Sequence, residues 1–523
     1  MKARCVMVLG TSSGAGKSWI TTALCRYYAN RGLKVAPFKA QNMSNNARVV
    51  VGGHPSEGGQ DQPEQDLSVS GEIGSAQYFQ ALAARALPDV RMNPLLLKPE
   101  ADTHSQVVLL GQVNRELTEL PWRGRSERVW PQIAKALDAL RAENDVVVIE
   151  GAGSPAEINL MSSDVVNLRV ARHADARCLL VSDIDRGGAF AHLYGTWALL
   201  PEEDRARISG FVLNKFRGDA SLLAPAPEML RELTGVSTVA VVPMRFGHGL
   251  PEEDGMFDAA DYSAPGPAIE SPRDLKIPHI SRSEDSAAPL KHVAIVAYPR
   301  ISNLDEFQPL KNVPGLRITW VRTPSQAQGA DTIILPGSKS TASDLAWLRA
   351  QGLDAFIAEH AARGGRVLGI CGGLQMLGEA LIDIHHVESQ GNAPGLGLLP
   401  LVTSFEPQKT VRRTQAPFGI LEGAWSSLSG VAVSGYEIHS GQTAQHPAMA
   451  AKGDVAREVM IGLGWQNAAG NVLGLYLHGL LEDAAALRAL FGANTPSLDD
   501  VFDRLAASIQ ADFAPGTLDA LVE

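Results

Sequence analysis

Cys371 has the surroundings of a catalytic nucleophile. It lies between an apolar run that predicts a buried strand, Val367–Ile370, and a stretch that predicts a helix, which is the strand-turn-helix setting of a nucleophile elbow. The adjacent glycines permit a sharp turn, and a helix N-terminus stabilises a thiolate. A lone cysteine is more often a buried structural residue. This setting favours instead an exposed, reactive thiolate that attacks a carbonyl carbon.

A thiolate nucleophile needs a base and a site for the developing oxyanion. His478 follows the apolar run Leu473–Leu477 and therefore stands at a strand end, as Cys371 does. We expect the backbone N–H groups of Gly372 and of Gly337, in a loop after another apolar run, to face the oxyanion. Glu482 is the candidate for the acid that orients His478, one helical turn away, although an exposed helix acid fits its position equally well.

A glycine-rich loop, Gly10–Ser18, follows the first apolar run and precedes a helical stretch. Small residues let backbone N–H groups surround phosphates, while Lys17 reaches the outer phosphates and Ser18 can bind Mg²⁺. Thr11 stands where the standard pattern has its first glycine. A glycine-rich turn without a ligand is disfavoured, because the Gly-Lys-Ser ending lies at the required junction. The predicted ATP contacts here are Thr11, Ser12, Gly14, Ala15, Gly16, Lys17 and Ser18.

Acidic residues at other strand ends are candidates for metal binding. Glu150 directly follows Val146–Ile149, and the carboxyl ends of strands are where α/β sheets build their sites. We therefore expect Ser18 and Glu150 to hold Mg²⁺. Asp183 is a further candidate, for which an ion pair with the nearby Arg186 is the alternative.

Short apolar runs separated by helical stretches position these residues. Such runs are typical of buried parallel strands covered by helices on both faces. They predict an α/β protein with two doubly wound domains. The runs are Cys5–Leu9, Lys34–Phe38, Val146–Ile149, Cys178–Val181, Phe211–Leu213 and Val239–Val242, then Val293–Val296, Ile318–Val321, Thr332–Leu335, Val367–Ile370 and Val472–Leu477.

Composition changes along the chain predict where the domains end. We expect a first domain at 1–265, a linker rich in Gly, Pro and acidic residues at 266–290, a second domain at 291–485 and a helical tail at 486–523. The polar stretch Gly52–Ser70 is predicted to be a surface insertion.

Charge and cysteine usage exclude several classes of function. The 523 residues carry a net charge of −11 without a basic run, so nucleic acid is not an expected partner. The four cysteines have no paired or metal-ligand spacing, which argues against a disulfide framework or a zinc site. No stretch approaches the length of a membrane span. We therefore expect a cytoplasmic protein with a small-molecule substrate.

The phosphate loop resembles that of dethiobiotin synthetase and its relatives, and the order of Cys371 and His478 resembles class I glutamine amidotransferases. That class usually has Glu two residues after the His, where this chain has Leu480. Taken in order along nearly the whole chain, several segments resemble the cobyric acid synthase family. They are Phe38–Asn46, Asn93–Pro99, Asp183–Gly188, Leu335–Thr341 and Gly435–Gly441, with Ser75 standing where Arg is expected.

This resemblance implies ATP-driven amidation of adenosylcobyrinic acid a,c-diamide at its b, d, e and g carboxylates, with ammonia from glutamine. It also implies that Asn214 and Lys215 recognise the nucleotide base. The residues expected to contact the corrinoid are Lys39, Asn42, Asn45 and Asn46, for which a position in a solvated loop is the alternative. Cobyrinic acid a,c-diamide synthase and CTP synthase share the two-domain plan, although CTP synthase should have the missing Glu. A P-loop switch of the partitioning type has no use for Cys371 and His478.

Overall fold

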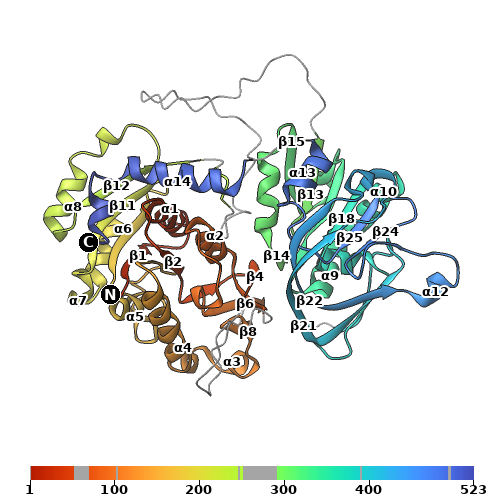
Figure 1. Ribbon diagram of the computed structural model, residues 1–523, viewed down its shortest axis with the longest axis horizontal. Helices are drawn as coiled ribbons and strands as arrows, with labels where there is room; N and C mark the ends of the chain where they lie inside the picture. The colour runs from red at the N-terminus through yellow and green to blue at the C-terminus, as the bar shows by residue number, and fades with distance from the viewer. Residues whose placement is uncertain are drawn as a thin grey trace, which may run out of the picture.

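The computed structural model describes residues 2–51, 70–101, 104–245, 248–250, 291–388, 391–492 and 496–523. These residues form two α/β units that lie next to each other (Figure 1). The predicted insertion lies almost wholly outside the described residues, as do the predicted domain end at 265 and the linker. The part of the chain that is described includes no helix long and apolar enough to cross a membrane.

The first unit is built on a parallel sheet whose strand order is β12-β11-β10-β1-β9-β2. Each of its strands overlaps one of the apolar runs predicted from the sequence. The strands are β1 (Arg4–Gly10), β2 (Val35–Phe38), β9 (Val146–Glu150), β10 (Arg177–Asp183), β11 (Ile208–Phe216) and β12 (Thr238–Pro243).

Helices cover both faces of this sheet, so its strands need no polar face. Side chains alternate between the faces along β1: Val6 and Val8 pack into one apolar cluster, Met7 and Leu9 into the other. The first cluster is covered by α1 (Lys17–Asn30) and α2 (Ser75–Ala83), and the second by α4 (Trp122–Glu143), α5 (Leu168–Ala174) and α6 (Ala189–Leu199).

The second unit contains a mixed sheet with the order β15-β13-β16-β18-β25-β24-β23. Its strands run parallel as far as β25, and the last two are antiparallel. The prediction of an α/β fold with two doubly wound domains is confirmed. The strands are β13 (Lys291–Val296), β15 (Leu316–Val321), β16 (Thr332–Leu335), β18 (Arg366–Ile370), β23 (Arg457–Met460), β24 (Gly464–Gln466) and β25 (Val472–Leu475).

Smaller elements surround the two sheets. In the first unit they are β3 (Gln41–Met43), β4 (Ala47–Val51), β5 (Ser70–Gly74), η1 (Val90–Met92), β6 (Leu95–Ala101), β7 (His104–Leu109), β8 (Gln112–Val113), α3 (Arg115–Glu119), η2 (Met161–Ser163), α7 (Glu202–Arg205), η3 (Ala220–Leu223) and α8 (Ala226–Thr234). In the second they are β14 (Ile301–Ser302), η4 (Leu304–Asn312), η5 (Pro324–Ala327), β17 (Gly337–Ser338), α9 (Thr341–Ala350), α10 (Leu353–Ala362), α11 (Gly372–Leu377), β19 (Ala380–Ile382), β20 (Ala393–Pro394), β21 (Leu401–Pro417), η6 (Gly423–Leu428), β22 (Ala432–Gln445), α12 (Pro447–Ala450) and α13 (Ala484–Phe491).

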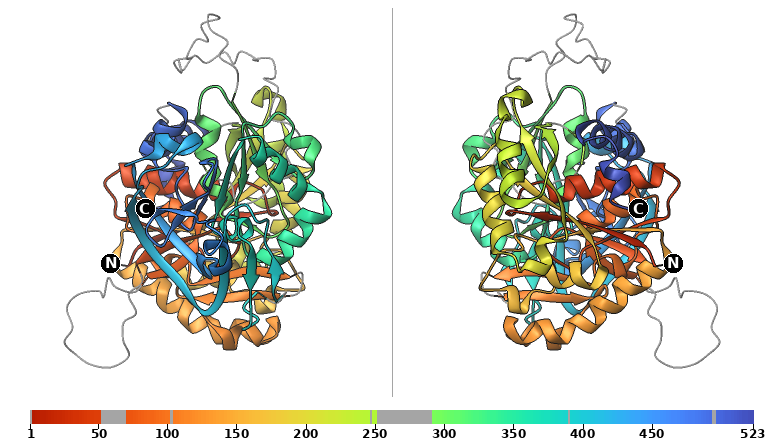
Figure 2. Two further views of the ribbon diagram at one scale, coloured as in Figure 1. Left: turned by 90° about the vertical axis from the view of Figure 1, so that its right-hand side faces the viewer. Right: turned by 90° about the vertical axis from the view of Figure 1, so that its left-hand side faces the viewer.

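The C-terminal helices return to the first unit (Figures 1 and 2). After α13, helix α14 (Leu498–Asp512) lies against α1, and α15 (Thr517–Ala520) ends the chain on the same unit. Phe502 and Ile509 of α14 belong to the apolar cluster on the α1 face of the sheet. The sequence predicts this helical tail but not its return to the first domain.

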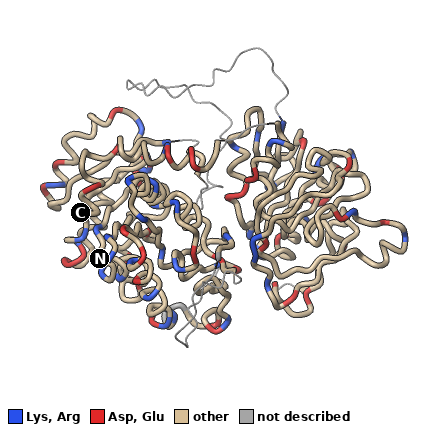
Figure 3. The backbone as a smooth tube through the Cα atoms, in the orientation of Figure 1, with Lys and Arg blue, Asp and Glu red and all other residues tan. Residues whose placement is uncertain are grey.

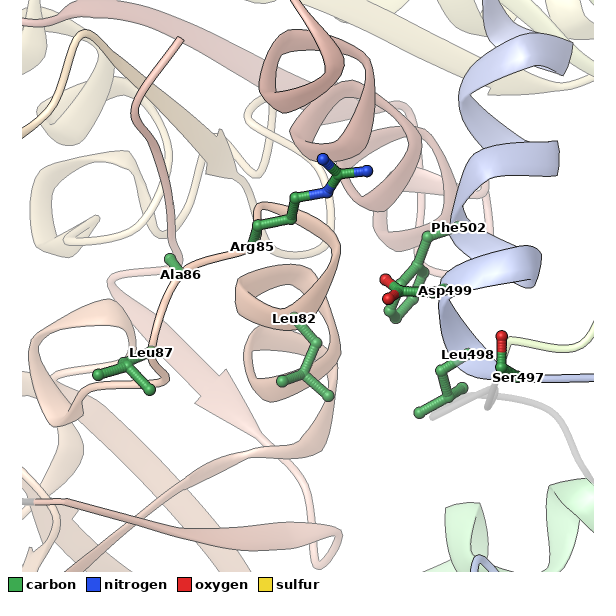
Figure 4. A pocket seen from close by; sticks show the side chains of 8 residues that line it. All are labelled: Leu82, Arg85, Ala86, Leu87, Ser497, Leu498, Asp499 and Phe502. Atoms are coloured by element: carbon green, nitrogen blue, oxygen red, sulfur yellow. The ribbon is translucent and has the colours of Figure 1, made fainter. Parts of the chain in front are cut away.

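A hollow of about 550 Å³ lies between the end of α2 and the start of α14 (Figure 4). Phe502 and Asp499 line it from α14, and Leu82 faces them from α2. The other lining residues are Arg85, Ala86, Leu87, Ser497 and Leu498. The α14 helix thus meets α2 incompletely at this end, although it is well packed on α1.

Charged residues of both signs lie along the facing sides of the two units (Figure 3). Glu72 of β5 forms buried ion pairs with Lys98 of β6 and with Lys409 of β21. Burial alone would raise the pKa of Glu72, but the two lysines hold it at about 2. The contact between the units therefore includes buried ion pairs.

Candidate active sites

Cys371 forms a strained turn between β18 and α11. Its backbone angles are φ 52° and ψ −106°, which a residue with a side chain rarely adopts. The turn brings the following residues close to the neighbouring strand, since a Cβ on Gly373 would lie 1.9 Å from the carbonyl oxygen of Leu335. The structure therefore contains the predicted nucleophile elbow, and glycine is required beside it.

The thiol of Cys371 is enclosed, and the expectation of an exposed cysteine is wrong. Only 6% of the residue is accessible, because the β22 strand lies over the elbow. The Sγ atom donates a hydrogen bond to the carbonyl oxygen of Ile438 in that strand, at 3.5 Å. Water is thereby largely excluded from the thiol, which strengthens electrostatic interactions around it.

His478 lies between Cys371 and a buried carboxylate. Its Nδ1 is 3.2 Å from Oε1 of Glu306 in η4, and the next backbone N–H, that of Gly479, donates to the other oxygen. The ring of Tyr436 stacks on the imidazole at 5.2 Å. Burial alone would lower the pKa of His478, but the Glu306 carboxylate and, next, Cys371 raise it to about 10. Such an arrangement can keep the imidazole charged and oriented.

Glu482 does not contact His478, which corrects the proposed third member of the triad. A turn from Gly479 carries its carboxylate toward the first unit, where Nη1 of Arg48 donates to its Oε2 at 2.7 Å. Glu306 occupies the place beside Nδ1. Glu306 lies 172 residues before His478, so the spacing of residues in the sequence does not connect them. A usable signal was the acidic pair Asp305-Glu306 shortly after a predicted strand.

The two glycines predicted to form the oxyanion site both lie close to the nucleophile and base. A Cβ on Gly372 would be 2.7 Å from the backbone nitrogen of Ser338, and a Cβ on Gly337 would be 3.1 Å from Cε1 of His478. The β17 segment that contains Gly337 is held by antiparallel pairing with β14. The assignment of their N–H groups to an oxyanion stays a prediction.

The phosphate loop joins β1 to α1 with Gly14 and Gly16 at positive φ, 71° and 97°. Lys17 Nζ donates to the carbonyl oxygens of Ser12 at 2.9 Å and Gly153 at 3.2 Å. Thr11 donates from its hydroxyl to that of Ser182. The lysine is thus already directed into the loop at the N-terminus of a helix, where phosphate oxygens are stabilised.

Asn214 and Lys215 support this loop. Nδ2 of Asn214 donates to the carbonyl oxygen of Ala15 at 2.8 Å, and Nζ of Lys215 donates to that of Gly14 at 2.8 Å and to Asp183 Oδ2 at 3.0 Å. A Cβ on Gly16 would lie 1.9 Å from the Asn214 amide. The two residues therefore lie where a nucleotide on the loop would come near them.

Glu150 is the buried acid of the phosphate site. Ser18 Oγ donates to its Oε1 at 2.8 Å, Lys39 Nζ to the same oxygen at 2.9 Å and Gln80 Nε2 to Oε2 at 2.5 Å. Burial alone would raise the pKa of Glu150, but Lys39 and these hydrogen bonds lower it below its usual value. Among the described residues no group of three or more His, Cys, Asp or Glu could hold a metal. The assignment of Mg²⁺ to Ser18 and Glu150 stays a prediction, for which one carboxylate and one hydroxyl suffice because Mg²⁺ commonly completes its shell with phosphates and water.

The residues predicted to contact the substrate lie in buried structure, so the solvated-loop alternative is wrong for three of them. Lys39, Asn42 and Asn46 are at most 6% exposed. Lys39 is bound to Glu150, whereas Asn46 accepts from the backbone N–H of Leu304 in the second unit at 2.9 Å. Asn45 donates to the carbonyl oxygen of Pro99, and its Oδ1 is buried without a hydrogen bond.

A phosphate loop on one sheet and a Cys-His-Glu arrangement on the other define a glutamine-dependent amidotransferase joined to a nucleotide-binding domain. Residues 6–254 match the CobQ/CobB/MinD/ParA nucleotide binding domain, and residues 292–486 match the CobB/CobQ-like glutamine amidotransferase domain. The protein is thus a glutamine-dependent amidoligase with an ATP-using domain.

Full-length relatives identify the family. The chain is 72% identical to the cobyric acid synthase of Acidovorax ebreus, over 100% of this chain and 99% of that one. It is 70% identical to the cobyric acid synthase of Variovorax paradoxus, with 100% of both covered, and 60% identical to that of Leptothrix cholodnii, with 99% and 97% covered. The chain belongs to the cobyric acid synthase family, whose members amidate a corrinoid in cobalamin synthesis.

Proposed function

We propose that this protein amidates the b, d, e and g carboxylates of adenosylcobyrinic acid a,c-diamide, in four rounds that each use one glutamine and one ATP. The observation that carries the proposal is the presence of two separate sites in one chain. One contains Cys371 and His478, and the other contains Lys17 and Glu150. Full-length similarity to cobyric acid synthases supports the choice of substrate.

In the glutaminase reaction, Cys371 attacks the side-chain amide carbon of glutamine. His478 takes the thiol proton and gives it to the leaving ammonia, after which water hydrolyses the acyl-enzyme to glutamate. Glu306 orients His478 through Nδ1. The N–H groups of Gly337 and Gly372 stabilise the oxyanion.

In the synthetase reaction, a substrate carboxylate attacks the γ-phosphate of ATP, which gives an acyl phosphate and ADP. Ammonia then attacks the acyl carbon, and inorganic phosphate leaves. Residues 11–18 bind the phosphates, with Lys17 stabilising the transferred charge. Ser18 and Glu150 would hold Mg²⁺, which would supply positive charge to neutralise the phosphates. Asp183 is placed close to this loop by its bond to Lys215 and is a further metal candidate.

The corrinoid approaches the polar segment that starts at Lys39. Lys39 is close to the phosphate site because it binds Glu150, so it suits a carboxylate that must reach the γ-phosphate. Asn42 and Asn45 belong to the same segment. Asn46 supports the contact between the units, and Asn214 and Lys215 border the nucleotide. We also propose that residues 1–265 carry the synthetase activity and that residues 291–485 carry the glutaminase activity.

The experiment is to incubate the protein with ATP, amide-¹⁵N glutamine and candidate corrinoids, and to follow the products by mass spectrometry. Adenosylcobyrinic acid a,c-diamide should pass through successive labelled products up to the tetra-amidated one. Labelling of cobyrinic acid at its a and c carboxylates alone would assign the protein to the related diamide synthases instead.

A further inference from the structure

The segment that carries Glu306 is attached to the first unit at its start. Residues 303–305, which open η4, bind residues 46–48 at the start of β4 by three successive contacts. Glu306 follows immediately, so its position depends on where these contacts hold the chain. The contacts are Leu304 N–H to Asn46 Oδ1 at 2.9 Å, Ala47 N–H to Asn303 Oδ1 at 3.2 Å, and Arg48 Nε to Asp305 Oδ2 at 2.8 Å.

Arg48 reaches the other side of His478 as well. Its guanidinium binds both carboxylate oxygens of Glu482, four residues after His478. It also lies over the ring of Tyr436 at 5.1 Å, and that ring stacks on the imidazole of His478 at 5.2 Å. One side chain from the first unit therefore contacts the segments on which His478, Glu306 and the stacking ring depend.

The surroundings of Arg48 favour a fixed geometry. Its side chain is 3% exposed and that of Asp305 is 1% exposed. Nε and Nη2 of Arg48 both donate to Oδ2 of Asp305, while Nη1 and Nη2 donate to separate oxygens of Glu482. A planar guanidinium held through several N–H groups restricts both position and angle, more than a single ammonium would. Removing Arg48 would leave the buried carboxylate of Asp305 without this partner, and the start of η4 would have to shift to reach water.

Arg48 also lies near residues that contact the phosphate site. Its guanidinium is 4.9 Å from the ring centroid of Phe79 on α2. The next residue of that helix, Gln80, donates to Glu150. Arg48 thus lies between the glutaminase triad and the acid proposed to hold Mg²⁺.

We propose that Arg48 is a positioning residue of the glutaminase: it holds Glu306 and His478 in their working orientation from the ATP-binding unit. This inference rests on the proposed glutaminase role of Cys371 and His478. Glutamine hydrolysis then requires the first unit to be in place.

The test compares Arg48→Met with Arg413→Met. Arg413 is a matched control because it crosses the same contact between the units, donating to the carbonyl oxygen of Val49. Arg48→Met should lower kcat for glutamine hydrolysis about 10- to 100-fold, a fraction of the roughly 10²- to 10⁴-fold that acid–base catalysis contributes, with KM for glutamine within about twofold. Ammonia-dependent amidation should persist, and Arg413→Met should hydrolyse glutamine like the wild type.

Further readouts separate positioning from a general structural role. Arg48→Lys keeps the charge but not the fork, so its kcat should lie between those of Arg48→Met and the wild type. The alkaline limb of the glutaminase pH profile should move to lower pH in Arg48→Met, because Glu306 then supports the imidazolium less well. If Arg48→Met does not fold, as judged by calorimetry, Arg48→Lys decides by the same comparison.

Unchanged glutamine hydrolysis in folded Arg48→Met, while the wild type is active, would overturn this inference alone. Equal losses in Arg48→Met and Arg413→Met would also overturn it, since any weakening of the contact would then suffice. Loss of ammonia-dependent amidation in folded Arg48→Met would place Arg48 in the synthetase site instead. A wild type that lacks glutamine hydrolysis would refute the proposed function itself.

Discussion

At the scale of single residues, the proposed glutaminase site contains a carboxylate and an imidazole that are both buried. Glu306 is 0% exposed and His478 is 1% exposed. Burying an unpaired charge is costly, so each group requires the other. Their contact fixes which nitrogen of His478 faces Cys371, and orientation of this kind is the main task of the acid in a catalytic triad.

Glu306→Gln should therefore lower kcat for glutamine hydrolysis about 10²- to 10⁴-fold, because the amide does not stabilise the imidazolium. Ammonia-dependent amidation should remain near the wild-type rate. The measurement is steady-state glutaminase activity, with Glu422→Gln, an exposed acid on the same unit, as the control. A wild-type rate in Glu306→Gln would show that His478 does not depend on this acid.

The pH dependence of the same variant has a definite sign. The pKa of His478 is raised from 6.5 to about 10 chiefly by Glu306, against the opposing effect of burial. The stability that this pair contributes is fully present below pH 6.5 and is lost as pH rises through about 10. Glu306→Gln should move the alkaline limb of glutaminase activity to lower pH, as measured by kcat/KM between neutral and alkaline pH. If the alkaline limb did not move, it would reflect the titration of a group other than His478.

Glu150 is the corresponding residue of the proposed synthetase site. Glu150→Gln keeps the shape of the side chain but removes the charge that would attract Mg²⁺. The Mg²⁺ concentration for half-maximal amidation should rise about 10- to 100-fold, the usual cost of disturbing a metal site. This concentration is measured by titrating ammonia-dependent amidation with MgCl₂, with Glu143→Gln, a change at an exposed acid, as the control. If the titration curves of Glu150→Gln and the wild type coincided, Glu150 would not be a ligand of Mg²⁺.

At the scale of elements, helix α14 completes the core of the first unit. Phe502 is 1% exposed, and the guanidinium of Arg26 lies 5.5 Å from its ring centroid. The helix therefore replaces solvent over the face of the sheet that α1 and α2 cover only in part. Although α14 follows the glutaminase domain in sequence, it stabilises the ATP-binding unit.

Phe502→Ala should lower the free energy of unfolding of the first unit by about 3–5 kcal/mol, the cost of an unfilled aromatic site in a core. Leu498→Ala, in the same helix but 38% exposed, should cost less than about 1.5 kcal/mol. Differential scanning calorimetry would show a downward shift of one transition in Phe502→Ala. Equal shifts in the two variants would mean that α14 packs only loosely.

At the scale of the whole molecule, the two chemistries lie on different sheets of one chain. Cys371 follows β18 of the second sheet, and the phosphate loop follows β1 of the first. Residues of the first unit nevertheless hold the start of η4. The reacting atoms of the two sites thus lie on different sheets, but residues of the first unit hold a segment of the second site.

Cys371→Ala should separate the two half-reactions. It removes the nucleophile that opens glutamine and leaves the phosphate loop intact, so glutamine-dependent amidation should vanish. Amidation with a high concentration of an ammonium salt at mildly alkaline pH should continue close to the wild-type ammonia rate. The measurement is corrinoid amidation with each nitrogen source. If the folded variant lost both reactions, Cys371 would belong to the synthetase chemistry as well.

The sequence by itself determined the features that depend on local patterns. Apolar runs located the strands of the first sheet and the parallel strands of the second, because a strand buried on both faces is apolar along its length. The Gly-Lys-Ser ending and the glycines beside Cys371 located the phosphate loop and the elbow, because those turns need particular residues at fixed spacing. Cys371, His478 and Gly337 lie together in the structure because the carboxyl ends of parallel strands meet at one edge of a sheet.

Only the tertiary structure decided which acid faces His478 and what covers each site. Glu306 is 172 residues from His478, and Arg48 is 257 residues from Asp305, so no spacing in the sequence connects them. Glu482 is near His478 in sequence, but a turn directs it to Arg48. Cys371 is enclosed because β22 folds over it, and α14 lies on the first unit because its apolar face fits there. Contacts of this kind arise from packing between distant segments, for which a single sequence carries no local signal.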